Sequence, residues 1–177
     1  MSQDSLRAAL RAHTSDLHRR LDDTVGTLST VESYRKFVAR SYAFRAAVEP
    51  TMRRLNDWNP LRLASALRAD MDDLGCDGMI VPRFDPASNW SANLGRLYVL
   101  EGSSVGARLL YSLARRLEFT EHYGARHLAL QVNEVARWKQ FRTLLDTIEG
   151  VDIGEALSGA QELFEFAIMV YSGHNRK

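Results

Sequence analysis

Apolar residues recur at spacings of three and four along almost the whole chain, and this period restricts the fold to packed helices. Near the N-terminus one such stripe consists of Leu6, Leu10, His13, Leu17 and Leu21. Residues at these spacings share one face of an α-helix. The alternation of apolar and polar residues that marks a strand is missing almost everywhere. We therefore predict an all-α single domain of seven or eight helices that covers residues 1–177.

Composition supports this fold class and limits the partners. The chain has 177 residues, of which 45% are hydrophobic, with only four prolines and a formal net charge of +1. That is enough apolar material for one buried core, and the charge gives no overall field to attract nucleic acid. No apolar run approaches the ~18 residues that span a membrane, and Cys76 is the only cysteine. We expect a cytoplasmic protein without an internal disulfide and without a nucleic-acid or membrane partner.

Helix-breaking and capping residues divide the N-terminal half into three expected helices. The first is capped by a short polar residue, namely Ser2, Asp4 or Ser5. It stops at Gly26, and a second helix capped by Thr30 runs over residues 31–56 with a kink or break at Pro50. Pro60 opens the third helix at a first-turn position, and that helix continues to about residue 74.

The C-terminal half begins with the one substantial loop, over residues 75–89. A short strand-like piece at residues 79–81 is possible within it. After the loop we predict four more helices, over residues 91–117, 120–129, 133–148 and 152–172.

The first helix carries a candidate metal ligand. His18 and Asp22 are four residues apart and are therefore neighbours on one helix face. A metal-bound histidine commonly donates its other ring N–H to a carboxylate, although the same spacing fits an ordinary surface pair. His13 lies about 140° away around the helix, so it cannot share a metal with His18 and is expected to be a core or boundary residue. Arg11, two turns before His18, is placed to pair with an acidic group of a ligand there.

Two glycines interrupt the strongest helical segment. Gly102 and Gly106 each cost a helix about 1 kcal/mol relative to alanine and lie on one side of it. They allow either a close approach of another helix or the contact of a flat ligand with bare backbone. Ser103 and Ser104 beside them either order water near a bound gas or hydrogen-bond the preceding turn.

These segments together resemble the haem oxygenase family, and its bacterial biliverdin-producing branch most closely. The resemblance rests on Thr14 to Asp22, with His18 at the position of the proximal iron ligand. It also rests on Leu97 to Ala107, which contains Glu-Gly-Ser-x-x-Gly-Ala. A third similar stretch is Tyr123 to Leu128, followed by Trp138-Lys139-x-Phe141.

The resemblance implies haem as both substrate and cofactor, held between the first helix and the glycine helix. Cleavage with O2 and electrons would give biliverdin, CO and ferrous iron. His18 would be the axial ligand of the iron. The implied haem-binding residues are Arg11, Thr14, Asp22, Lys139 and Arg142. The implied catalytic residues are Gly102, Ser103 and Gly106. Mammalian-type members carry aspartate where this chain has Ser103, so protons would come through water and hydroxyls.

The resemblance also implies partners and leaves alternatives. A ferredoxin or an NADPH-dependent reductase would supply electrons, and a bilin-binding photoreceptor is a possible acceptor of the product. The main alternative is a non-catalytic haem carrier or sensor. A thiaminase-like hydrolase would need a nucleophilic cysteine, and Cys76 has no evident base beside it. A purely structural helical module would bind no ligand. The sequence does not fix which meso carbon is cut.

Overall fold

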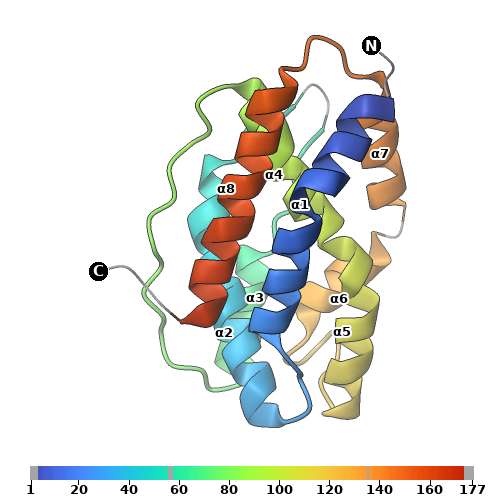
Figure 1. The fold of residues 1–177 in the computed structure, drawn as a ribbon. Coiled ribbons are helices and arrows are strands. Elements are labelled where there is room, and N and C mark those ends of the chain that lie inside the picture. Colours follow the sequence, from blue (N-terminus) through green and yellow to red (C-terminus); the bar gives the residue numbers. More distant parts are fainter. Residues whose placement is uncertain (1–3, 56–57, 135, 174–177) are drawn as a thin grey trace.

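Helices account for the regular structure of this protein, and the all-α prediction is confirmed (Figure 1). The computed structural model describes residues 4–55, 58–134 and 136–173. Within them lie eight α-helices, one 3-10 turn and no β-strand longer than an isolated bridge. The helices are α1 (Asp4–Val25), α2 (Val31–Val48), α3 (Ala64–Asp73), α4 (Trp90–Gly102), α5 (Ser104–Arg116), α6 (Arg126–Asn133), α7 (Arg137–Thr147) and α8 (Ile153–Ser172), with η1 (Glu49–Thr51) after α2.

The closest helix crossing joins α4 and α8. A Cβ atom on Gly95 would lie 1.8 Å from the carbonyl oxygen of Ala156. A Cβ atom on Gly159 would lie 2.1 Å from the carbonyl oxygen of Ala92. The two backbones therefore touch without intervening side chains. Helix α8 also packs along α1, and Figure 1 shows these two helices side by side at the front of the molecule.

A second part of the core joins α2, α3 and α6. Tyr34 is fully buried, stacks on Phe119 with ring centroids 4.8 Å apart, and donates its hydroxyl proton to the carbonyl of Gly124 at 2.8 Å. Around it pack the buried side chains of Leu63, Leu67, Met71 and Leu128. This cluster supports the N-terminal half of α2 and the start of α6.

The predicted ends of the first two helices are only partly correct. Gly26 ends α1 with φ of +68°, and Thr30 forms a capping box with Ser33 at the start of α2. Pro50 lies in η1, so α2 ends at Val48 and is shorter than predicted. The candidate cap Ser2, the side chains of the candidates Asp4 and Ser5, and position 56 lie outside what the structure describes.

Pro60 does not open the third helix. Helix α3 begins at Ala64 because the buried carboxylate of Glu49 accepts hydrogen bonds from the backbone N–H groups of Leu63 (2.6 Å) and Ala64 (3.2 Å). Those N–H groups would otherwise be unsatisfied at a helix start. The cap therefore comes from a residue 14 positions earlier in the chain.

Three further predicted boundaries are wrong. The segment predicted as one helix over 91–117 is two helices, α4 and α5, separated at Ser103. Turns occupy much of 120–129, with Gly124 at φ of +74°, and α6 starts at Arg126. Helix α7 starts at Arg137 rather than 133, and residue 135 is outside the described chain. Residues 79–81 form no strand, whereas the prediction for 152–172 is confirmed by α8.

Helix length and hydropathy bear on membrane insertion. None of the helices in the described ranges combines the length and the apolar character needed to cross a bilayer.

The backbone contact between α4 and α8 predicts a large cost for one methyl group. Gly95→Ala forces the two helices apart and should lower the free energy of unfolding by about 3 kcal/mol. Gly106→Ala, where the added Cβ meets nothing within 4 Å, should be neutral or stabilising by up to ~1 kcal/mol. Urea titration of both variants measures this, and equal midpoints for the two would contradict the described crossing.

Candidate functional site

The predicted pair on α1 forms and lies at the surface. Nδ1 of His18 is 3.1 Å from Oδ2 of Asp22, and the two side chains are 63% and 68% exposed. The imidazole ring also meets the edge of Phe164 on α8, with ring centroids 5.9 Å apart. Such an exposed pair adds little to stability. Nε2 of His18 makes no hydrogen bond with any described residue, so this nitrogen is available to a ligand.

Arg11 and Thr14, on the preceding turns of α1, lie next to Tyr98 of α4. Burial raises the pKa of the Tyr98 phenol, while a hydrogen bond with Thr14 and the charge of Arg11 act in the opposite direction. Thr14 is buried and its hydroxyl also donates to the carbonyl of Leu10 at 2.8 Å. Tyr98 lies one helical turn before Gly102. Tyr98 therefore links the N-terminal half of α1 to the glycine segment, and sequence reasoning did not single it out.

The two glycines have different surroundings. A Cβ atom on Gly102 would lie 3.7 Å from the ring of Trp138, which is ordinary van der Waals contact. A Cβ atom on Gly106 would meet nothing within 4 Å. Beside Gly106, Val105 and Leu109 are 63% and 67% exposed. Close helix packing therefore does not explain Gly106, and this face of α5 presents bare backbone and apolar side chains to open space.

Both serines after Gly102 hydrogen-bond the preceding turn. The hydroxyl of Ser103 donates to the carbonyl of Leu100 at 2.6 Å, and that of Ser104 donates to the carbonyl of Glu101 at 2.7 Å. Ser103 also accepts hydrogen bonds from Nη2 of Arg45 at 3.1 Å and from Nε2 of Gln131 at 3.0 Å.

A buried ion pair ties the end of α4 to α7. Glu101 is 2% exposed and accepts two hydrogen bonds from Arg137, at 2.6 and 2.8 Å. The indole N–H of Trp58 donates to the same carboxylate at 3.1 Å, and the guanidinium lies over the Trp58 ring. Because both hydrogen bonds form at once, a bidentate pair of this kind fixes the orientation of the guanidinium relative to the carboxylate as well as their separation. It places α7, with the exposed cations Lys139 and Arg142, beside the glycine segment.

A second polar group, missed by the sequence reasoning, is fully buried between α3 and α6. Asp70 accepts hydrogen bonds from Nδ1 of His127 at 2.7 Å and from the backbone N–H groups of Arg126 and His127, both at 3.0 Å. Asp70 thus caps α6 from another helix. Nε2 of His127 is buried and has no protein partner among the described residues. The only sequence signal was the Tyr123 to Leu128 stretch, which had no role attached to it.

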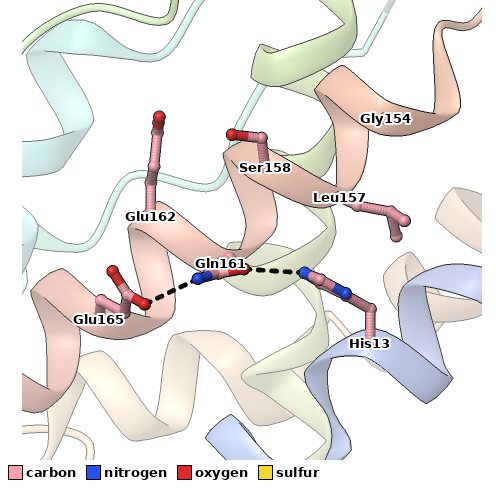
Figure 2. A pocket seen from close by; sticks show the side chains of 7 residues that line it. All are labelled: His13, Gly154, Leu157, Ser158, Gln161, Glu162 and Glu165. Carbon is pink, nitrogen blue, oxygen red and sulfur yellow. Dashed lines mark hydrogen bonds between the residues drawn. The ribbon is translucent and has the colours of Figure 1, made fainter.

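His13 lies apart from these groups, at the edge where α1 meets α8 (Figure 2). Its side chain is exposed, so the expectation of a core position is wrong, while a boundary position fits. Its Nε2 is 3.0 Å from Oε1 of Gln161, and Nε2 of Gln161 donates to Oε1 of Glu165 at 2.9 Å. The shallow pocket here is lined by His13, Gly154, Leu157, Ser158, Gln161, Glu162 and Glu165. It contains none of the predicted site residues. Across the described chain, no three His, Cys, Asp or Glu side chains converge as a metal site would require.

Comparisons with known proteins agree over most of the chain. A model of the family described as Heme oxygenase matches residues 4–172. The chain is 34% identical to "Heme oxygenase PigA" of Pseudomonas aeruginosa over 93% of this chain and 92% of that protein. It is 31% identical to "Heme oxygenase" of Xanthomonas campestris pv. campestris over 60% of this chain and 66% of the relative. Its fold matches the solved heme oxygenase of Neisseria meningitidis with a TM-score of 0.69, at 24% identity and over 94% and 89% of the two chains.

The buried pair of Asp70 and His127 predicts a loss of stability on acidification. Burial lowers the pKa of His127, so below about pH 6.5 the unfolded chain binds a proton that the folded chain rejects. Burial alone would raise the pKa of Asp70, but hydrogen bonds from His127 lower it, and its contribution is lost at still lower pH. The free energy of unfolding should therefore fall with pH from about 6.5 downward, by at most ~1.4 kcal/mol per pH unit for one proton.

Urea unfolding at several pH values tests this. His127→Asn keeps a donor toward Asp70 without a titrating ring, so its stability should vary less between about pH 5 and 7. His122→Asn, at a side chain 88% exposed, is the matched control. Identical pH profiles for the two variants would refute the assignment.

Proposed function

The chain belongs to the haem oxygenase family, and on that premise we propose that it binds haem between α1 and the α4–α5 segment and degrades it. The observation that carries the placement is the open backbone at Gly106, where an added Cβ would meet no other described atom within 4 Å. The proposed products are biliverdin, CO and ferrous iron. The proposed site is the set of haem-binding and catalytic residues that the family resemblance implies, together with Tyr98 and Trp138.

The residues present suit a flat apolar ring with a metal centre and acidic substituents. Oδ2 of Asp22 lies 3.1 Å from Nδ1 of His18, so the carboxylate favours the tautomer with the proton on Nδ1 and would leave the Nε2 lone pair free for iron. Val105 and Leu109 offer apolar surface beside bare backbone. Cations suited to carboxylate substituents are placed at Arg11, Lys139 and Arg142, which form no ion pair with the described residues.

When bound, haem supplies the iron that activates oxygen and the ring that is opened. His18 would hold the iron, and Asp22 would fix the orientation and tautomer of the imidazole. Gly106 would leave room for the ring, because nothing lies within 4 Å of its Cβ position, and Gly102 lets the Trp138 ring lie against the backbone beside it. Arg11, Lys139 and Arg142 would bind the acidic substituents and hold the substrate in one orientation, which would decide the carbon that is cut. Thr14 would act indirectly, through its contact with Tyr98. Ser103 would act through its hydrogen bond to the carbonyl of Leu100 at the end of α4.

Electrons come from outside the chain, and we propose a ferredoxin or an NADPH-dependent reductase as the donor. A bilin-binding photoreceptor is the proposed acceptor of the product. A carrier or sensor would bind haem by the same residues without opening it. Reduction of the haem complex with ascorbate under oxygen separates these functions, because an enzyme develops the absorbance of a bilin. A stable haem spectrum under those conditions would overturn the proposed reaction.

Removal of the proposed iron ligand should abolish normal haem ligation. His18→Ala is expected to lose the Soret spectrum of the histidine complex and to lower the single-turnover rate by at least ~100-fold. His13→Ala is the matched control, since this residue lies on the same helix in the separate pocket of Figure 2. Haem titration followed by optical spectroscopy measures both. An unchanged spectrum and turnover in His18→Ala would remove His18 from the site.

Because the backbone of α5 at Gly106 faces open space, a large side chain at this position should weaken haem binding without lowering the stability of the fold. Gly106→Leu should fold as well as the parent, because a side chain there meets open space. It should weaken haem binding by about tenfold or more, because the side chain occupies the proposed site. Gly78→Ala, also in open surroundings but in the loop before α4, should leave haem affinity unchanged. Equal haem affinities for the two variants would place the haem elsewhere.

A further inference from the structure

The break between α4 and α5 is held by side chains from two other helices. Ser103, the single residue between α4 and α5, has ordinary helical dihedral angles (φ −60°, ψ −23°), so its backbone conformation does not by itself demand a break. Its hydroxyl is the point where Arg45 of α2 and Gln131 of α6 converge.

The hydrogen-bonding capacity of this hydroxyl is fully used. A serine hydroxyl has one proton and two acceptor sites. The proton goes to the carbonyl of Leu100 at 2.6 Å, and the two acceptor sites receive Nη2 of Arg45 at 3.1 Å and Nε2 of Gln131 at 3.0 Å. While this arrangement holds, Ser103 cannot donate a proton to a ligand, so its role must be a different one.

Arg45 is unusually placed for a cation. Its side chain is 6% exposed, and its nearest carboxylate is Glu49, whose Oε1 is 3.8 Å from Nη1. That carboxylate is already engaged in capping α3, and Nη1 donates to the carbonyl of Leu61 at 3.3 Å. The other terminal nitrogen of the guanidinium, Nη2, donates to the hydroxyl of Ser103. Without the Ser103 oxygen, donors on two buried side chains would lose their acceptor, which is costly in a protein interior.

We propose that Arg45 and Gln131 are positioning residues, which clamp Ser103 and so set the direction in which α5 leaves α4. The direction of α5 decides where the bare backbone at Gly106 faces. This inference rests on the proposed function, in which that backbone is one wall of the haem site. We call the three side chains the Ser103 clamp.

The neighbouring serine offers a matched control for the test. Ser104 donates to the preceding turn just as Ser103 does, but within the described chain no side chain of another helix hydrogen-bonds its hydroxyl. Ser103→Ala should raise amide hydrogen exchange over residues 102–107 of the haem-free protein by about tenfold. Ser104→Ala should change it less than about twofold, and Ser103→Thr, which keeps the hydroxyl, should restore the parent rate. In the haem complex, Ser103→Ala should also shift the visible spectrum, and Ser104→Ala should not.

A double-mutant comparison then assigns the partner. Arg45→Met removes the donors while keeping a long side chain, and its effect on exchange should not add to that of Ser103→Ala. Equal exchange in Ser103→Ala and Ser104→Ala would overturn the clamp. Faster exchange without a change in the spectrum would overturn its positioning role. If the parent protein binds no haem, the proposed function fails, whereas the exchange data still decide whether the clamp exists. The serine variants give that answer even if Arg45→Met does not fold.

Discussion

The contact of α4 with α8 at Gly95 and Gly159 is the constraint from which the geometry of the site follows. Because the two backbones touch there, α4 has little freedom to slide or rotate on α8. Helix α1 packs along the same α8. The position of Gly102 relative to His18 is therefore set through one shared helix, and Tyr98 adds a direct link from α4 to Thr14 of α1.

Buried carboxylates fix the irregular parts of the chain around this crossing. Glu49 on η1 caps α3, Asp70 on α3 caps α6, and Glu101 on α4 holds Arg137 at the start of α7. In each case one element supplies an acceptor for the beginning of another. A charge buried in this way is tolerated only when its acceptor sites are filled. Each carboxylate thus fills its own acceptor sites and pairs N–H groups or cations of a neighbouring element that would otherwise lack a partner.

The errors of the sequence prediction arise where a cap or partner comes from a residue distant in the chain. Apolar period and local capping predicted the all-α class, the cap at Thr30 and the pairing of His18 with Asp22, because each depends on residues within about four positions. Pro60 misled the prediction of α3, since the real cap is Glu49, and the start of α6 was missed because Asp70 lies 56 residues away. Tyr98 carries no local signal, because its neighbours on α1 are distant in the chain. Arg45 has Glu49 four residues later, but its contacts with Leu61 and Ser103 come from distant parts of the chain.

The succession of caps from Glu49 to α3 and from Asp70 to α6 has a consequence for the energetics of unfolding. Gln131 of α6 extends this succession to Ser103. Melting of the end of α2 would strip α3 of its cap, and melting of α3 would do the same to α6. These segments should therefore open together as one cooperative unit. A ligand that stabilises the α4–α5 junction would then protect amides as remote as those at the beginning of α3.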